Sequence, residues 1–240
     1  MTSTGRWDTS LGNSEVSDAI QLILPKIGKS PAILLLRHAE RNAILAGMSI
    51  EEAFDVGLTD KGRNDAENLG KLLAKSHRIQ IELAVSSPSI RCRETLEHIL
   101  QGGNYKSNIS EDIRLFGKNV LEKGMGEKLI NTPSLYIDAI HDKVSLGYDQ
   151  NFKKTADRYI GVLAEYLNKL SNDSNAFGLV CSHDILIGLI PFAYFTPGVF
   201  DEKQMPGLLE PVLLQRTTHR TKLEVIWRGE SQFISLPEEA

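Results

Sequence analysis

The sequence predicts an α/β protein, a three-layer sandwich with a mainly parallel central sheet and an edge strand near the C-terminus. Three short apolar runs, at residues 32–36, 81–87 and 176–182, have the length of strands that are covered on both faces. Segments with the apolar spacing of amphipathic helices lie between and after these runs. Strands that alternate with helices favour a parallel sheet with helices on both of its faces.

The N-terminal part of the chain is expected to contribute a short helix and then the first strand. Residues 16–28 carry apolar side chains at helical spacing and end in Pro25 and Gly28. We therefore expect residues 1–30 to form an N-terminal extension with a short helix, and residues 31–240 to form one domain. The run at 32–36 is the first buried strand.

The next elements continue the alternation of helix and strand. Residues 57–78 predict an amphipathic helix, since Thr59 can cap it and apolar residues recur on one face. Strand 81–87 follows, and Pro88 suits the first turn of the helix after it. Gly102 and Gly103 end that helix.

The C-terminal half begins with a stretch that has no regular pattern. Residues 104–150 are rich in Asn, Lys and Gly, and predict an irregular insertion around residues 102–150. Residues 151–170 are helical, strand 176–182 is the third buried strand, and an apolar segment at 183–194 follows it. Residues 222–227 alternate enough to be the last strand, at the edge of the sheet.

Composition limits the classes of function. The chain has 240 residues, 41% hydrophobic and 24% charged, as in an ordinary globular protein. Its net charge of −4 argues against a nucleic-acid or membrane partner, and no apolar run reaches the roughly 18 residues of a membrane span. The N-terminus lacks the basic and apolar regions of a signal peptide. Cys92 and Cys181 are too few for a disulfide scaffold or a zinc site, so we expect a cytoplasmic protein.

Polar clusters follow the three buried strands directly. Arg37 and His38 come after the first strand, Arg91 after the second and His183 after the third. The carboxyl ends of parallel strands meet at one edge of a sheet, so these four side chains are expected to converge.

Two arginines and two histidines are suited to an oxyanion. Guanidinium groups repel cations and make a poor metal site, but their paired N–H groups match phosphate. The helices that follow Ser87 and Ser182 point their N-termini at the same place, which also favours an anion. A phosphoryl group is the expected ligand, with sulfate or a carboxylate as alternatives.

Histidine at such a site can act as a nucleophile. A neutral imidazole attacks phosphorus to give a covalent phosphohistidine that water then hydrolyses. The arginines would offset charge on the phosphoryl oxygens in the transition state. A carboxylic acid is still needed to protonate the leaving oxygen and to activate water.

Four ordered motifs resemble those of the histidine phosphatase superfamily, which includes cofactor-dependent phosphoglycerate mutases and histidine acid phosphatases. Over residues 31–190, LLLRHAE is similar to its RHG signature, GLTDKGRNDA to LTxxGxxQA, VSSPSIRCRET to SSPxxRcxqT, and VCSHD to the second-histidine motif. The resemblance implies a phosphoglycerate mutase-like fold and neither a metal nor an organic cofactor. It implies that His38 is the nucleophile, that Arg37 and Arg91 bind the phosphoryl group, and that His183 completes the site.

The departures from these motifs indicate a phosphatase. Arg41 and Ile44 stand where mutases carry a hydroxyl residue and an asparagine, and Arg41 resembles the second arginine of the acid-phosphatase signature. Ala39 replaces the usual glycine. Gly117 stands where the mutase-like branch has its acidic proton donor, whereas Asp184 resembles the aspartate of the acid-phosphatase His-Asp pair.

Alternatives remain for several of these residues. Asp184 could instead cap a helix, and Arg41 could form a surface ion pair. Glu40 and Glu122 are the fallback proton donors.

We therefore expect a phosphatase that hydrolyses a small-molecule phosphomonoester through a phosphohistidine. The catalytic residues are His38, Asp184, His183, Arg37 and Arg91, and Arg41 also binds substrate. A phosphoglycerate-type mutase and a non-catalytic phosphate-binding module are the alternatives. Specificity is expected from the loops at 42–57, 104–150 and 195–210, where Lys118, Lys123 and Lys128 could meet anionic groups. The substrate and the oligomeric state stay open.

Overall fold

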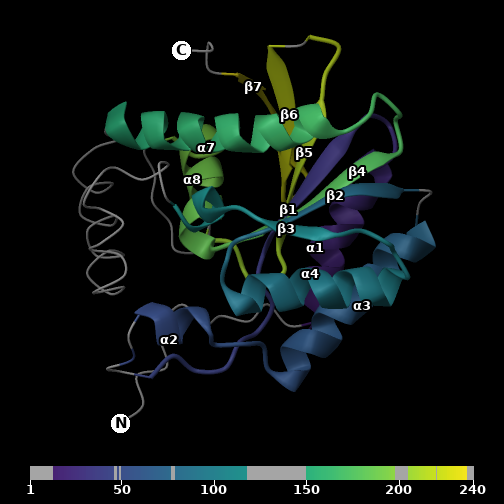
Figure 1. The fold of residues 1–240 in the computed structure, drawn as a ribbon. Coiled ribbons are helices and arrows are strands. Elements are labelled where there is room, and N and C mark those ends of the chain that lie inside the picture. The colour runs from purple at the N-terminus through teal and green to yellow at the C-terminus, as the bar shows by residue number, and fades with distance from the viewer. Residues whose placement is uncertain are drawn as a thin grey trace.

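The computed structural model describes residues 13–45, 48, 50–76, 79–117, 150–197, 205–219 and 221–236. Within them, a seven-stranded sheet runs through the centre in the order β3-β2-β4-β1-β5-β6-β7 (Figure 1). The strands are β1 (Ala32–Arg37), β2 (Gln80–Ser86), β3 (Ile109–Glu111), β4 (Ala176–Ser182), β5 (Pro211–Arg216), β6 (Lys222–Trp227) and β7 (Glu230–Ser235).

The sheet is mixed. Strands β3, β2, β4 and β1 run parallel to one another. Strand β5 is antiparallel to β1, and β6 and β7 continue in antiparallel fashion. The three predicted strands are confirmed as β1, β2 and β4, and together with β3 they form the parallel part of the sheet; β1 and β4 are buried throughout, and β2 is buried over its last three residues.

A strand at residues 222–227 and an edge strand near the C-terminus are both present as predicted, but they are two strands and not one. Strand β6 is paired on both sides, and β7 is the edge strand. Only Ile234 of β7 is buried, so its sequence gives no apolar alternation. A two-residue turn at Arg228 and Gly229 joins β6 to β7, and both residues have positive φ, 49° and 84°. This conformation matches the twist of a tight hairpin.

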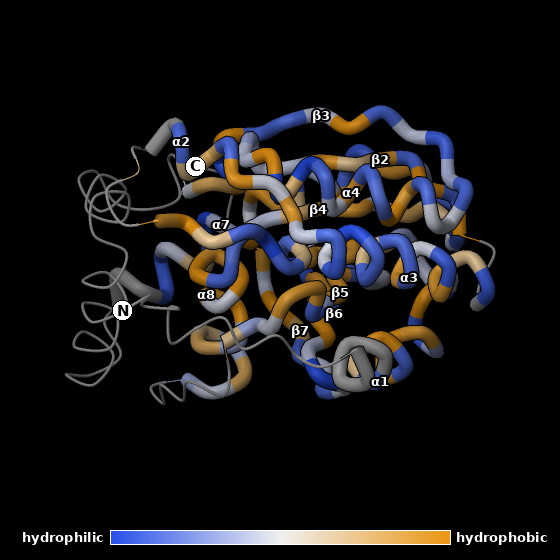
Figure 2. The backbone as a smooth tube through the Cα atoms, turned by 90° about the horizontal axis from the view of Figure 1, so that it is seen from below, coloured by the Kyte–Doolittle hydropathy of each residue, from blue (hydrophilic) through white to orange (hydrophobic). Residues whose placement is uncertain are grey.

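Helices cover both faces of the sheet, as the three-layer prediction requires (Figure 1). One face is covered by α7 and α8, and the other by α1, α3 and α4. The bounds are α1 (Asn13–Ile23), α2 (Ile50–Phe54), α3 (Asp60–Ser76), α4 (Ile90–Gly103), α7 (Gln150–Lys169) and α8 (Asp184–Tyr194), with short 3₁₀ helices η1 (Leu24–Lys26) and η2 (Ile113–Phe116). The helices carry both hydrophilic and hydrophobic stretches (Figure 2), which is the pattern of amphipathic cover.

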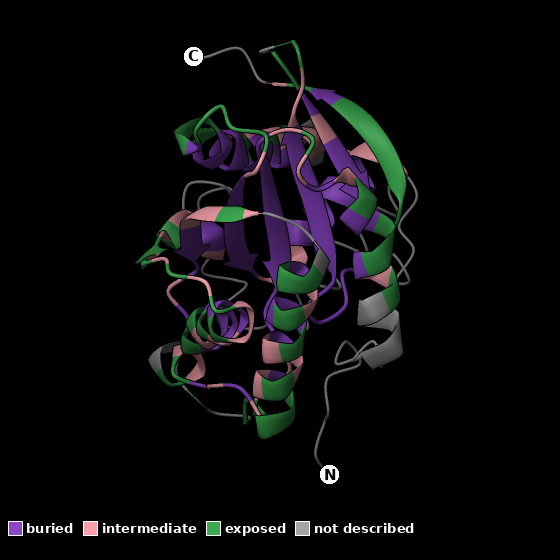
Figure 3. Cartoon of the chain, turned by 90° about the vertical axis from the view of Figure 1, so that its right-hand side faces the viewer, coloured by how far each residue is buried: buried purple, intermediate pink, exposed green. Residues whose placement is uncertain are grey.

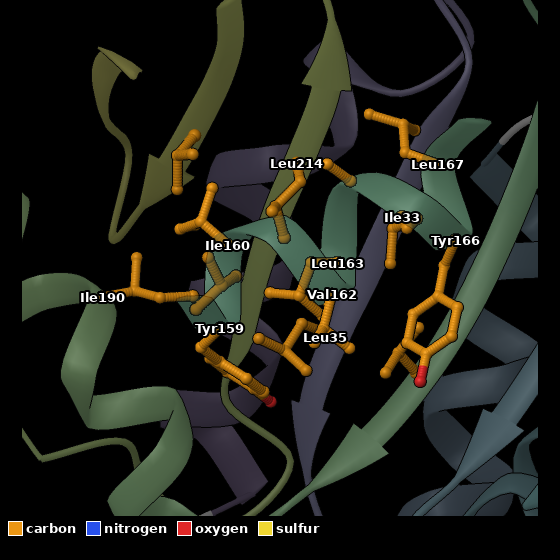
Figure 4. Close-up of a cluster of buried hydrophobic side chains, with 14 of the residues drawn as sticks. Ile33, Leu35, Tyr159, Ile160, Val162, Leu163, Tyr166, Leu167, Ile190 and Leu214 are labelled. Carbon is orange, nitrogen blue, oxygen red and sulfur yellow. The ribbon is translucent and has the colours of Figure 1, made fainter. Parts of the chain in front are cut away.

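Alternation along β1 divides the core between the two faces. Ile33 and Leu35 pack in the layer with α7 and α8, while Leu34 and Leu36 pack in the layer with α1, α3 and α4. All six residues of β1 are buried, and the central strands are buried along their length (Figure 3). Figure 4 shows the first layer, where Tyr159 and Leu163 of α7 lie over β1. Because β1 is fixed from both faces, the residues that follow it have a rigid base.

The N-terminal helix packs onto the sheet. It spans Asn13–Ile23 and continues into η1, whereas the sequence predicted a helix within residues 16–28. Ile20 and Ile23 are fully buried in the same core as Leu34. Gln215 of β5 donates a hydrogen bond of 2.8 Å to the carbonyl oxygen of Lys26. Residues 20–27 therefore contribute to the core of the sheet.

Part of the predicted irregular insertion is regular. Strand β3 pairs in parallel with β2, and η2 follows it. Strand β3 has three residues, which is too short to show the alternation of apolar and polar residues by which a strand is predicted. The Asp112 carboxylate starts η2 by accepting hydrogen bonds from the Arg114 N–H (2.9 Å) and the Tyr166 hydroxyl (2.7 Å). Residues 118–149, which include Glu122, Lys118, Lys123 and Lys128, lie outside the described residues.

The sequence predicted no membrane-spanning segment. Across the described ranges, every helix is too short or too polar to span a bilayer.

Candidate active site

Three parallel strands bring their carboxyl ends to one edge of the sheet, where α4 and α8 begin and α2 lies close by (Figure 1). Arg37 at the end of β1 is level with Ser182 at the end of β4, and Ser86 of β2 is level with Cys181. The His38 N–H donates to the Ser182 carbonyl oxygen at 3.2 Å. The rings of His38 and His183 consequently lie with centroids 5.6 Å apart, nearly edge to face.

The tautomer of His38 follows from its hydrogen bond. Its Nδ1 lies 2.8 Å from the carbonyl oxygen of Ala39. A carbonyl can only accept, so Nδ1 carries the proton and Nε2 keeps its lone pair. His38 is 4% exposed, and burial together with the positive charges of Arg91 and Arg37 lowers its pKa well below the ordinary value. His38 is therefore a neutral imidazole with a nucleophilic Nε2.

The backbone beside His38 is held by α4. Ala39 is fully buried, and its N–H donates to the Thr95 hydroxyl at 3.0 Å. That hydroxyl donates in turn to the Arg91 carbonyl oxygen at 2.7 Å. The alanine that replaces the usual glycine therefore fits, with its methyl group in the core.

Arg37 is buried, with only 5% of its surface exposed. Its Nη1 donates to the Pro206 carbonyl oxygen at 3.1 Å, and its Nη2 lies 2.9 Å from Asp184 Oδ2. Its Nε–H is buried and meets no acceptor among the described residues.

Arg91 repeats this arrangement from the other side. It is 7% exposed, its Nη1 donates to the Ala53 carbonyl oxygen of α2 at 2.8 Å, and its Nε–H also meets no acceptor in the described ranges. Burial and the nearby charge of Arg41 lower the pKa of Arg91. Two buried N–H donors without acceptors are costly, and they indicate a site for an anion.

His183 is held by contacts on three sides. Its Nδ1 lies 3.5 Å from Arg91 Nη2, which can only donate, so Nε2 carries the proton and donates to Ser87 Oγ at 2.8 Å. Cys92 Sγ lies 3.8 Å from the same Nε2. The Phe116 ring lies edge to face with the imidazole, with ring centroids 5.1 Å apart. The centroid of the Phe54 ring lies 4.3 Å from that of Phe116. An aromatic wall thus stands directly beside His183.

Asp184 is the first residue of α8 and faces Arg37. Its Oδ1 accepts a hydrogen bond of 2.8 Å from the Ile185 N–H, and Oδ2 pairs with the guanidinium of Arg37. Burial opposes its ionisation, but Arg37 and His183 hold the pKa of this carboxyl below its ordinary value. Asp184 is therefore a carboxylate in this structure. Its position also suits the positive end of the helix dipole.

Other predicted residues lie around this centre. Arg41 forms a backbone bridge with Leu58, and its Nη1 donates to the Asn42 carbonyl oxygen at 2.9 Å. Glu40 accepts a hydrogen bond from the Thr59 hydroxyl at 2.9 Å and lies 3.4 Å from Lys61 Nζ. The carboxylate of Glu40 is thus engaged with the start of α3, where Thr59 Oγ1 also accepts the Gly62 N–H at 3.0 Å as the predicted cap.

Gly117 ends η2 with φ of 105°, in the left-handed region that favours glycine. An acidic side chain at this position would strain the backbone, so the chain could not place the mutase-type donor here without changing the turn.

Sequence reasoning missed Phe54, Phe116 and the turn at Pro206. It placed Ser87 at the strand end beside the site but did not assign its side chain the contact with His183. Phe116 and Pro206 contact site residues that are far away in the chain, and no local sequence pattern predicts these contacts.

Across the described part of the chain, no group of three or more His, Cys, Asp or Glu side chains is arranged to hold a metal ion.

Known proteins share this fold. Mycobacterial hydrolase 2 superposes with a TM-score of 0.53 at 15% identity, covering 85% of this chain and 92% of the hydrolase. The mycobacterial glucosyl-3-phosphoglycerate phosphatase superposes with a TM-score of 0.51 at 15% identity, covering 86% and 97%. The phosphoglycerate mutase of Bacillus anthracis has a TM-score of 0.48 at 19% identity, covering 87% and 94%. A comparison with curated proteins found no match.

The sequence itself matches one family model. Residues 33–196, which carry all four motifs and every residue of the site except Pro206, match the model of the histidine phosphatase superfamily, branch 1. This chain belongs to the histidine phosphatase superfamily.

Proposed function

We propose that this protein is a phosphatase that hydrolyses a small-molecule phosphomonoester through a covalent phosphohistidine on His38. One observation carries the proposal. A neutral His38, with its Nε2 lone pair available, stands among two buried guanidinium groups that each keep an Nε–H without an acceptor in the described ranges.

The arginines bind and the histidine attacks. Arg37 and Arg91 hold the phosphoryl oxygens, and the His183 ring supports Arg91 on one side of the site. The Nε2–P bond forms as the P–O bond to the alcohol breaks, and the departing oxygen takes a proton. Because the guanidinium groups are already fixed by the Pro206 and Ala53 carbonyls, they need no reorganisation as charge develops. In this scheme the positive charge comes from arginine, without a metal.

Asp184 is the proposed proton carrier. In the resting site it is ionised and paired with Arg37. A phosphoryl dianion that binds Arg37 brings like charge beside Asp184, which raises the pKa of the carboxyl and favours uptake of a proton. The protonated acid then serves the leaving oxygen. In the second step the carboxylate accepts a proton from water as the water attacks phosphorus and the N–P bond breaks.

A rapid-quench experiment with a labelled phosphomonoester tests the proposal. We expect acid-labile phosphate on the protein, lost in His38→Ala and retained in His219→Ala, whose exposed histidine lies outside the site. A panel of phosphomonoesters supplies the substrate. Undiminished labelling of His38→Ala would rule out this nucleophile, and phosphate binding without turnover on any ester would favour the binding module.

A further inference from the structure

The segment at 205–210 holds Arg37 at two points. The guanidinium Nη1 of Arg37 donates to the Pro206 carbonyl oxygen at 3.1 Å, and the Leu209 N–H donates to the Arg37 carbonyl oxygen at 3.2 Å. Because Nη2 pairs with Asp184 and Nη1 binds Pro206, the two contacts together fix the plane of the guanidinium and the direction of its Nε–H.

One peptide unit links Arg37 to a buried carboxylate. The Pro206–Gly207 peptide offers its carbonyl to Arg37 and donates its N–H to Glu210 Oε2 at 2.8 Å. Glu210 is 2% exposed. A carboxylate on the N–H and a guanidinium on the carbonyl polarise this peptide in the same sense, so each hydrogen bond strengthens the other.

Arg228 holds Glu210 in turn. Its Nε lies 2.6 Å from Oε1 and its Nη2 lies 3.0 Å from Oε2, which is the two-pronged geometry of a strong pair. The same Nη2 lies 3.4 Å from the Met205 carbonyl oxygen. The Arg228 guanidinium also stacks over Trp227, 4.6 Å from the ring centroid.

Backbone strain is concentrated in the same place. Leu209 and Arg228 have φ of 59° and 49°, which is uncommon for residues other than glycine, asparagine and aspartate. Such strain persists where the surrounding contacts fix it, and it gathers at functional sites. Both strained residues belong to the set of contacts that ends on Arg37.

We propose that the Glu210–Arg228 ion pair is a positioning device for Arg37, acting through the Pro206–Gly207 peptide to aim the guanidinium at the bound phosphoryl group. This inference rests on the proposed function only in taking Arg37 as a phosphoryl ligand. A merely structural ion pair would close the turn and add stability, but its loss would leave anion affinity unchanged.

The test is the affinity for inorganic phosphate, measured by calorimetry on the full chain. Arg228→Asn removes the ion pair and leaves Glu210 with the Gly207 N–H, and the Asn-Gly sequence it creates before β7, which tight hairpins favour, offsets part of the stability lost. We expect phosphate to bind about tenfold more weakly, as for the partial loss of one hydrogen bond to a charged group. Arg228→Lys, which keeps the charge but not the two-pronged geometry, should show a smaller loss.

Arg216→Ala is the matched control. This arginine also binds backbone carbonyls, those of Leu167 and Leu170 at 2.6 and 2.7 Å, but lies away from the site. It should lower thermal stability and leave phosphate affinity as in the wild type. In an Arg37→Ala background, Arg228→Asn should cost no further affinity, because the two residues act through one contact.

Two results would overturn the inference. One is wild-type phosphate affinity in a folded Arg228→Asn protein, and the other is an undiminished effect of Arg228→Asn when Arg37 is already absent. Phosphate binding without ester hydrolysis would refute the proposed function and leave the positioning role supported. Absence of phosphate binding by the wild type would refute both.

Discussion

Replacing Asp184 by asparagine separates its proposed role in proton transfer from its role in the resting site. The substitution keeps the size of the side chain and an oxygen that can accept the Ile185 N–H, so the start of α8 should be preserved. It removes the proton donor, and it also removes the negative charge that lies 2.9 Å from Arg37. Turnover and anion affinity should therefore move in opposite directions.

The magnitudes follow from the charges. A carboxylate and a phosphoryl group that share Arg37 lie roughly 5 Å apart, and each pair of unit charges then repels by about 3 kcal/mol at an effective dielectric constant near 20. Part of this is lost to rearrangement, so we expect Asp184→Asn to bind phosphate about tenfold more tightly. An alkyl phosphate, whose leaving alkoxide is a strong base, should turn over about 10²–10⁴ times more slowly. For p-nitrophenyl phosphate the leaving group needs little protonation, so the first step should slow much less.

The assay compares kcat/KM, which reports the first step, for both esters, together with the inhibition constant of phosphate. Asp173→Asn is the control, since the Asp173 carboxylate likewise accepts a local backbone N–H, from Asn175 at 3.0 Å, but in an exposed turn before β4. It should leave all three values unchanged. Equal, small effects of Asp184→Asn on both esters would refute the acid role and return it to Glu40 or to the central region of the chain.

Two further predictions concern metal and pH. Turnover should survive EDTA, because Arg37 and Arg91 supply the positive charge; loss on chelation with recovery on adding Mg²⁺ or Zn²⁺ would contradict this. His38 has a folded-state pKa below the ordinary value near 6.5, so below that pH the unfolded chain binds a proton that the folded chain does not, and wild-type stability falls as pH falls. His38→Asn lacks this contribution. In urea unfolding, the free energy of unfolding of the variant should therefore rise relative to that of the wild type by up to about 1.4 kcal/mol per pH unit below 6.5. A difference in unfolding free energy that stays constant between pH 7 and 5 would refute the prediction.

The fold was predictable where burial leaves a local mark. Strands β1, β2 and β4 are covered on both faces over all or part of their length, and their apolar runs show this without any knowledge of partners. Strand β7 is different, because four of its first five residues are exposed and it is ordered by pairing with β6. Strand β3 is three residues long and depends on β2 in the same way. Elements that exist because of their neighbours leave no period in their own sequence.

The site was predictable to the extent that topology alone places it. Parallel strands bring Arg37, His38 and His183 to one edge whatever the loops do, and Arg91 follows within one turn of α4. The contacts that set the orientation and pKa of these residues were not predictable in this way. The Arg37 guanidinium reaches Pro206 across 169 positions of the chain, and Phe116 reaches His183 from a segment that looked irregular. Sequence patterns gave the inventory of charged groups, and the tertiary structure set their orientation and pKa.

The charges of the buried site explain why it contains an aspartate next to an arginine. Arg37 and Arg91 contribute two positive charges, His38 is neutral, and Asp184 contributes one negative charge, so the resting site is positive by one. Without Asp184, the two buried guanidinium groups would keep the Pro206 and Ala53 carbonyl dipoles as partners but would lose a full negative charge. With it, the arrival of a phosphoryl dianion leaves the site one negative charge in excess, and a proton on Asp184 restores neutrality. In the proposed mechanism, the carboxylate that offsets the charge of the arginines is therefore also the group that a bound phosphoryl dianion would prime as an acid.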